Sequence, residues 1–269
     1  MSKKGILVVS FGTSYEETRK ATIEAIENKI RETYKDYEVR RAFTSGMIIN
    51  KLKNRDNIHI DNPEEALEKM ARDGFEEVIV QSLHIIPGDE YDEIKIAVHR
   101  FRNKKAFKKL TLGRPLLYRI EDYFNVVEAL KPQIPEIRED SAVLFMGHGS
   151  VHHSNSCYSQ FQYVLKQSGL KNIFVANVEG FPEIDVVVRK LKERNIKEVT
   201  LMPFMIVAGD HATNDMAGED EDSWKNILEK EGFKVNIYLH GLGENRGIQD
   251  IYTQYVQDCI DNNPLKEEI

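Results

Sequence analysis

Two stretches of this chain follow one pattern: residues 68–94 read "EKMARDGFEEVIVQSLHIIPGDEYDEI" and residues 189–215 read "RKLKERNIKEVTLMPFMIVAGDHATND". Each begins with a polar helical segment, continues as a run of apolar and β-branched residues, and ends in a Gly-Asp loop before further helical sequence. Repeated patterns of this length indicate two copies of one structural unit. We therefore interpret the chain as a duplication.

Further pairs of stretches extend the duplication outward in the same order along the chain. They are "ILVVSFGTS" (Ile6–Ser14) with "VLFMGHGSV" (Val143–Val151), and "RAFTSGMI" (Arg41–Ile48) with "ANVEGFPEI" (Ala176–Ile184). In each pair a predicted strand is followed by a loop of small residues and then by a helix. Equivalent loops nevertheless carry different chemistry, and the opposed residues are Phe11 and His148, Ser45 and Glu179, and Glu90 and His211.

Short β-branched runs alternate with amphipathic helical stretches along the whole chain. This alternation is typical of parallel sheets covered by helices on both faces, so the sequence predicts an α/β fold. The predicted strands are Ile6–Ser10, Glu38–Phe43, Glu77–Ser82, Lys109–Gly113, Ala142–Gly147, Ile173–Val178, Glu198–Pro203 and Lys234–Leu239. Between them we expect helices such as Tyr15–Tyr34 and Ile184–Asn195.

The boundary between the two halves is predicted after residue 127, giving an N-terminal half of residues 1–127 and a C-terminal half of residues 128–269. The stretch "LKPQIPEIRED" (Leu130–Asp140) supports this position because it combines two prolines with a charged run. We expect the last helical stretch, Ile248–Ile260, to cross back and pack on the N-terminal half.

The composition argues against several classes of protein. With 30% charged and 41% hydrophobic residues the chain should be globular, and its formal net charge of -7 argues against a nucleic-acid partner. The cysteines Cys157 and Cys259 form no CxxC pair, so we expect neither a disulfide framework nor a thiolate zinc site. The start, "MSKKGILVVSFG", is a predicted strand rather than a signal peptide, and no run approaches the ~18 apolar residues of a membrane span. We expect a cytoplasmic protein without a membrane partner.

Motifs for nucleotide-driven and serine-hydrolase chemistry are missing from the sequence. There is no GxGxxG after a strand, no Walker A sequence, no GxSxG elbow and no HExxH. A different kind of site is indicated by "LFMGHGSVHH" (Leu144–His153), in which an apolar run stops at a histidine held between two glycines. Glycines at such positions allow the backbone to approach a flat ligand.

Three candidate site residues, His148, Glu179 and His211, each follow a predicted strand of the second half. Loops at the carboxyl ends of parallel strands converge, and ligands of α/β proteins bind there. Two imidazoles and a carboxylate suit a first-row divalent metal and leave positions for water or substrate. We interpret His148 as a metal ligand or a proton acceptor.

Two residues of the first half are open to more than one interpretation. Glu90, in "GDEYDEI", either stabilises a helix N-terminus or acts as a general base in the position that His211 occupies in the repeat. His84, in "SLHIIPG", is either a wall residue or a chemically active one.

The motifs together resemble one family of enzymes nearly end to end. The stretches are "VVSFGTSYEET", "RAFTSGMIINKL", "QSLHIIPGDEYDEI", "VLFMGHGS", "VEGFPEID" and "LMPFMIVAGDHATNDMAGEDEDSW". In this order they are similar to the anaerobic sirohydrochlorin cobaltochelatases of the CbiK type, which belong to the class II chelatases with ferrochelatase. The resemblance implies two similar flavodoxin-like or Rossmann-like domains with parallel sheets and an active-site cleft between them.

The reaction implied by the resemblance is ATP-independent insertion of Co2+ into sirohydrochlorin on the anaerobic route to cobalamin (vitamin B12). The implied partners are the tetrapyrrole and a divalent metal, with no cofactor beyond the substrate metal. His and carboxylate ligands also accept Fe2+, Ni2+ and Zn2+, so iron insertion for sirohaem is an alternative activity. A homo-oligomer is compatible with the sequence.

The resemblance also assigns residues. Metal ligands would be His148, Glu179 and His211, and catalytic residues would be His148, His211 and Glu90. We expect the tetrapyrrole to lie against loop residues after the first three strands, where helix starts attract its carboxylates. These residues are Ser10, Phe11, Gly12, Thr13, Ser45, Gly46, Met47, Leu83 and His84.

Two other functions use the same features. A non-catalytic carrier of tetrapyrrole or metal would need the binding surface but no proton acceptor. A two-lobed solute-binding module would also consist of a pair of similar α/β halves, although such modules usually carry the signal peptide that we do not predict.

Overall fold

The computed structural model describes residues 2–265, and the chain divides into two compact units. The first contains the chain up to Arg119 together with the segment that starts at Ile248, and the second is Ile120–Gly247. The boundary predicted after residue 127 therefore differs from the structure. It falls inside α6 (Ile120–Leu130), which packs with α7 (Ser156–Gln167) in the second unit, so the proline-containing stretch that follows is a loop within that unit.

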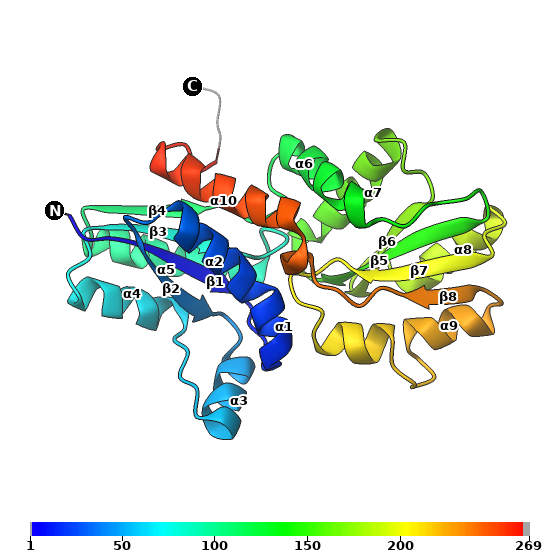
Figure 1. The fold of residues 1–269 in the computed structure, drawn as a ribbon, viewed down its shortest axis with the longest axis horizontal. Coiled ribbons are helices and arrows are strands. Elements are labelled where there is room, and N and C mark those ends of the chain that lie inside the picture. The colour runs from blue at the N-terminus through cyan, green and yellow to red at the C-terminus, as the bar shows by residue number, and fades with distance from the viewer. Residues whose placement is uncertain (1, 266–269) are drawn as a thin grey trace. The chain divides into compact units, whose positions relative to one another are not determined.

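The first unit is built on a parallel sheet with the strand order β2-β1-β3-β4. Its strands are β1 (Lys4–Ser10), β2 (Glu38–Phe43), β3 (Glu77–Ser82) and β4 (Lys109–Gly113). Its helices are α1 (Glu16–Ala21), α2 (Ile23–Thr33), α3 (Gly46–Asp56), α4 (Pro63–Arg72), α5 (Asp89–Asn103) and α10 (Arg246–Ile260). Figure 1 labels these elements.

The second unit repeats this topology with the strand order β6-β5-β7-β8, and all its strands are parallel. Its strands are β5 (Ser141–Gly149), β6 (Ile173–Glu179), β7 (Glu198–Pro203) and β8 (Lys234–Ile237). Besides α6 and α7, its helical elements are η1 (Lys131–Gln133), η2 (His153–Asn155), α8 (Ile184–Glu193), the π-helical turn η3 (Ala212–Met216), α9 (Trp224–Lys230) and η4 (Leu242–Glu244). The shared strand order agrees with a duplication.

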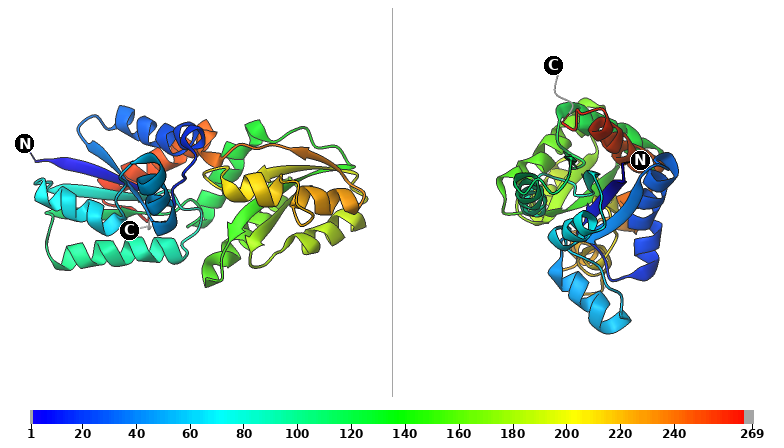
Figure 2. Two further views of the ribbon diagram at one scale, coloured as in Figure 1. Left: turned by 90° about the horizontal axis from the view of Figure 1, so that it is seen from below. Right: turned by 90° about the vertical axis from the view of Figure 1, so that its left-hand side faces the viewer.

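Both faces of each sheet are buried, as the apolar strands predict. In β1, Leu7 and Val9 pack with α4 and α5, while Ile6 and Val8 are equally buried and point to the other face because strand side chains alternate. Figure 2 shows helices on both faces of the first sheet. The sheets are thus rigid platforms whose carboxyl ends carry the candidate residues.

The predicted strands agree closely with the structure, and one predicted helix is wrong. Strands β2, β3, β4 and β7 have the predicted bounds, β1, β5 and β6 are slightly longer, and β8 ends at Ile237 instead of Leu239. The predicted helix Tyr15–Tyr34 is two helices, α1 and α2, which meet at Thr22. The Thr22 hydroxyl donates to Thr18 O at 2.6 Å, a backbone contact of the kind that bends helices.

The last helix, α10, belongs to the first unit. The buried Tyr252 hydroxyl donates to the carbonyl oxygens of Leu83 (3.1 Å) and His84 (3.2 Å). Arg114 donates to Asp258 at 2.8 Å, and both side chains are almost completely buried. Helix α10 therefore fixes the loop that follows β3.

Candidate functional site

The second unit brings two of the predicted site residues together. His148 lies near the end of β5, and His211 lies directly before the turn η3, in the segment that follows β7. Because β5 and β7 are neighbours in a parallel sheet, their carboxyl ends meet at one edge. The two imidazole centroids are 4.8 Å apart with an interplanar angle of 86°. This histidine pair is the central feature of the candidate site.

The hydrogen bonds of the two rings define which nitrogen carries the lone pair. His148 Nδ1 lies 3.1 Å from Gly149 O, and a carbonyl only accepts, so Nδ1 carries the proton and Nε2 the lone pair. His211 Nδ1 lies 2.5 Å from Asp215 Oδ2, and the carboxylate imposes the same tautomer. Nε2 is thus the nitrogen in each ring that suits a metal or a proton.

The glycines around His148 have a different role from the predicted one. Gly149 has φ of +81°, and a Cβ there would lie 1.6 Å from Glu179 O. A Cβ on Gly147 would lie 2.6 Å from the Tyr158 ring. The space beside both glycines is occupied by the protein, so they allow neighbouring elements to pack closely rather than giving a flat ligand access to the backbone.

Glu179 is the last residue of β6 and pairs with Gly149 in the sheet register. Its side chain is exposed at the same edge as the histidine pair. Within residues 2–265, however, no three His, Cys, Asp or Glu side chains are gathered closely enough to hold a metal ion. The structure therefore brings the two histidines together. Glu179, the third predicted ligand, is related to them only through its pairing with Gly149, the residue after His148.

Loops after β1 and β2 hold most of the predicted substrate-binding residues of the first unit. Thr44 N donates to Ser10 O at 2.9 Å and Ser45 N donates to Phe11 O at 3.2 Å, which ties the loops together. The Ser45 amide is therefore engaged within the protein. Its hydroxyl caps α3 by accepting from Ile48 N at 3.3 Å.

Exposed apolar side chains and one unsatisfied hydroxyl mark these loops. Phe11 is 42% exposed and Met47 is 74% exposed. Ser10 is buried, and its Oγ has no hydrogen-bond partner among the described residues. Gly12 has φ of +97°, and Thr13 Oγ1 accepts from Tyr15 N at 3.2 Å, which holds the loop in shape. The loops therefore expose apolar area, while the Ser10 hydroxyl lies beneath their surface.

His84 lies after β3 between two hydroxyl groups. Its Nδ1 is 2.9 Å from Ser82 Oγ, and its Nε2 is 3.3 Å from Thr44 Oγ1. Burial lowers the pKa of this imidazole to about 4, because the charged form loses its hydration. His84 is therefore a neutral hydrogen-bonding group at ordinary pH, and its carbonyl is held by α10, as is that of Leu83.

Glu90 is the second residue of α5 and shares the first turn with other carboxylates. Burial, followed by the charges of Glu90 and Asp89, raises the pKa of Glu93. A carboxylate in this position stabilises the helix N-terminus whether or not it takes part in catalysis. Gly46 is the first residue of α3 and precedes Met47.

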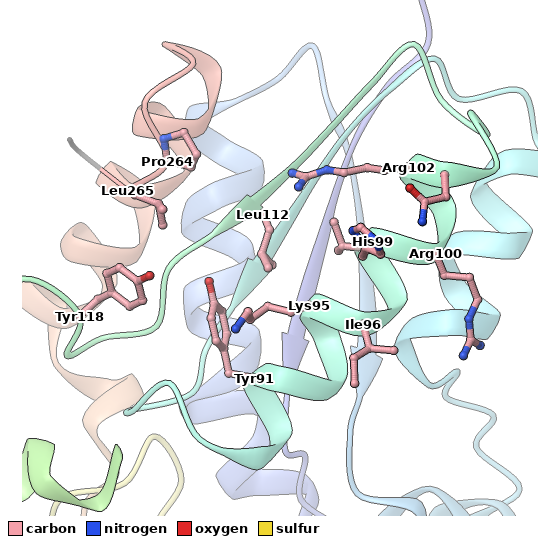
Figure 3. A pocket seen from close by; sticks show the side chains of 12 residues that line it. Tyr91, Lys95, Ile96, His99, Arg100, Arg102, Leu112, Tyr118, Pro264 and Leu265 are labelled. Carbon is pink, nitrogen blue, oxygen red and sulfur yellow. The ribbon is translucent and has the colours of Figure 1, made fainter. Parts of the chain in front are cut away.

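A cavity of about 680 Å³ lies elsewhere in the first unit and contains none of the predicted site residues (Figure 3). It is bounded by the outer side of α5, by Leu112 of β4, and by Tyr118, Pro264 and Leu265. Its cationic residues are partly neutralised, since Lys95 pairs with Asp92 and Arg100 with Glu64. The candidate residues of each unit lie instead at the strand ends, which carry the histidine pair in the second unit and the exposed apolar residues in the first.

Asp215 is the residue that the sequence analysis missed. The signal was present as the spacing of His211 and Asp215 in "GDHATND", since side chains four residues apart lie on one face of a helical turn.

No helix in the described part of the chain is long and apolar enough to cross a membrane.

Comparison with known proteins gives consistent matches over almost the whole chain. The family model described as cobalt chelatase (CbiK) matches residues 4–261. A sirohydrochlorin cobaltochelatase of Salmonella typhimurium is 43% identical over 258 residues, with 96% of this chain and 97% of that protein covered. The sirohydrochlorin cobaltochelatase CbiKC of Nitratidesulfovibrio vulgaris is 35% identical over 261 residues, with 97% and 92% covered.

Solved structures with the same fold are more distant in sequence. SirB from Bacillus subtilis with Fe3+ has a TM-score of 0.63 at 15% identity, covering 97% of this chain and 96% of that one. CbiX, described as the terminal enzyme of sirohaem biosynthesis in denitrifying bacteria, has a TM-score of 0.52 at 15% identity, covering 94% and 98%. At this level of identity the similarity extends to the two-unit α/β fold.

Proposed function

Because this chain belongs to the cobalt chelatase (CbiK) family, we propose that it inserts Co2+ into sirohydrochlorin without ATP, on the anaerobic route to cobalamin. The observation that carries the proposal is the histidine pair, with His148 and His211 at 4.8 Å. In both rings Nδ1 is bound to an oxygen of the protein, which leaves Nε2 as the basic nitrogen. The reaction needs such groups.

Metal insertion exchanges the ligands of a Co2+ ion for the pyrrolic nitrogens of the ring, while two N–H protons leave. A neutral imidazole either holds the metal loosely or accepts one of these protons near neutral pH. In this proposal His148 and His211 present the metal, and Glu179, beside Gly149 in the register, completes the ligand set when the metal binds. Glu90 is the additional acid/base candidate.

The first unit supplies the surface for the macrocycle in this proposal. Phe11 and Met47 offer exposed apolar area to the ring. Ser10 Oγ is buried without a partner among residues 2–265, so Ser10 supports these loops from below their surface. His84 stays neutral and hydrogen-bonds without adding charge. Thr13, Gly12, Ser45, Gly46 and Leu83 shape the loops.

The test is an anaerobic assay of the purified protein with sirohydrochlorin and Co2+, followed by the loss of the metal-free absorption bands. We expect multiple turnovers in the wild type and at least a ~100-fold loss in His148→Ala and in His211→Ala. His240→Ala is the matched control, because this exposed histidine of the second unit also pairs with a carboxylate, at 2.7 Å from Glu244.

Each outcome of this assay has a defined meaning. Turnover that persists in both site variants would overturn the assignment of the histidine pair. A spectral change that saturates at one equivalent without metallation would indicate a carrier. Fe2+ is assayed in parallel, and faster insertion of Fe2+ than of Co2+ would replace cobalt by iron as the substrate metal.

A further inference from the structure

We propose that Asp215 is a positioning residue that orients His211 toward the substrate metal, an inference that rests on the proposed role of His211. His211 Nδ1 and Asp215 Oδ2 are 2.5 Å apart, within hydrogen-bonding distance. A carboxylate bound to Nδ1 fixes the tautomer and the ring orientation, and it makes Nε2 a stronger electron donor. Asp215 acts through His211 and does not itself hold the metal.

The π-helical turn η3 holds this pair in place. Ala212 and Met216, at its two ends, are completely buried in the core of the second unit. Thr213 Oγ1 donates to Gly209 O at 2.9 Å, and Gly218 N donates to Asn214 O at 3.0 Å. The turn is thus anchored at both ends.

The exposed side of the turn carries the pair itself. The side chains of His211 and Asp215 keep 35% and 46% of their exposure, so they face outward from the anchored turn. A wider-than-usual helical turn of this kind often occurs at functional sites. The backbone is fixed by burial, and the remaining freedom of the imidazole is rotation of its own side chain, which Asp215 removes.

The duplicated half provides an internal comparison. In the alignment of residues 68–94 with residues 189–215, His211 is opposite Glu90 and Asp215 is opposite Ile94. Ile94 is completely buried in the core below α5, where an apolar residue stabilises a regular helix. A carboxylate four residues after this position therefore occurs in the second half, which has His211, and not in the first, which has Glu90. The two aligned positions differ together between the halves. A purely structural role for Asp215 would not require this coincidence.

The test compares Asp215→Asn with Glu244→Gln. Both changes replace a carboxylate that accepts from histidine Nδ1 four residues before it, and Glu244 has no place in the proposed site. Asparagine presents its amide NH2 or a weaker acceptor, so the ring orientation is no longer imposed. We expect turnover of Asp215→Asn to fall about 10- to 100-fold, and Glu244→Gln to stay within about twofold of the wild type.

A second readout separates positioning from general damage to the fold. Co2+ alone is titrated into each protein, and its visible d–d absorption reports the ligand field at the metal. We expect weaker Co2+ binding and an altered d–d spectrum for Asp215→Asn, and partial recovery for Asp215→Glu, which restores a carboxylate. Thermal unfolding by circular dichroism measures the folded fraction of each variant.

The outcomes distinguish this inference from the proposed function. If His211→Ala is inactive but Asp215→Asn keeps full turnover and the wild-type Co2+ spectrum, the positioning role is refuted and the role of His211 stands. If His211→Ala itself keeps full activity, the proposed function of the pair fails first. A loss of activity in Asp215→Asn that matches its loss of folded protein would also overturn the inference.

Discussion

Removal of the buried carboxylate of Asp258 should destabilise the first unit severely. Arg114 and Asp258 retain 1% and 7% of their side-chain exposure, and Arg114 Nη1 lies 2.8 Å from Asp258 Oδ2. The guanidinium also lies 3.8 Å from the centre of the Tyr255 ring and donates to Pro264 O at 2.9 Å. This cluster joins the loop after β4 to α10, the C-terminal helix that packs in the first unit.

The expected magnitude follows from the burial. In Asp258→Ala the positive charge of Arg114 stays buried without its carboxylate, and breaking such a pair costs about 3–5 kcal/mol. With a shift in melting temperature of roughly 2–4 °C for each kcal/mol, we expect a decrease of at least about 6 °C. The matched control is Asp250→Ala on the same helix, because Asp250 is 64% exposed in its pair with Lys29. An exposed pair contributes about 1 kcal/mol or less.

Urea unfolding followed by circular dichroism measures both variants. Asp258→Ala should lower the free energy of unfolding of the first unit by several kcal/mol, and Asp250→Ala should be close to the wild type. Equal effects of the two substitutions would refute the argument that burial of the ion pair determines its contribution. An unchanged stability of Asp258→Ala would show that α10 is held by its apolar contacts alone.

Two further predictions concern the residues near the strand ends. His84 has a folded-state pKa of about 4, below the ~6.5 of an unfolded chain, so stability from this residue is complete above about pH 6.5 and is lost as the pH falls toward 4. The free energy of unfolding, measured between pH 4 and 7, should therefore depend less on pH in His84→Asn than in the wild type. The total loss of stability over this range should be smaller in the variant by up to about 3 kcal/mol, and an identical pH dependence would contradict the lowered pKa. Gly149→Ala should lose more than about 1 kcal/mol of stability and most of its turnover, because φ is +81° and the new Cβ would lie 1.6 Å from Glu179 O. Wild-type unfolding and activity in this variant would show that the end of β5 is free to shift.

The duplicated topology explains how one fold presents two kinds of surface. The sheets have the same strand order, and the loops that follow equivalent strands lie at equivalent positions. In the second unit these positions carry His148 and His211, whereas in the first they carry Phe11 and Glu90. Since the strands are buried on both faces, substitutions in the loops change the chemistry without changing the core.

The sequence by itself determined the strands and the duplication. Parallel strands that are buried on both faces appear as continuous apolar runs, so Glu77–Ser82 and Glu198–Pro203 could be located to the residue. It also predicted that His148 and His211 would converge, because the carboxyl ends of parallel strands share an edge. These features depend on local patterning and on rules of topology, both of which can be applied to the sequence alone.

Only the tertiary structure decided how the site residues are held. Local patterning did not show that α1 and α2 separate at Thr22, where a side-chain hydrogen bond to the backbone accompanies the break. The pairing of His211 with Asp215 depends on a π-helical turn anchored in the core, and the exclusion of space beside Gly149 depends on the neighbouring strand β6. The hydrogen bonds of His148 and His211 join residues that are close in sequence, but the backbone conformations that allow them, and the close approach of Gly149 to Glu179, are fixed only when the chain packs.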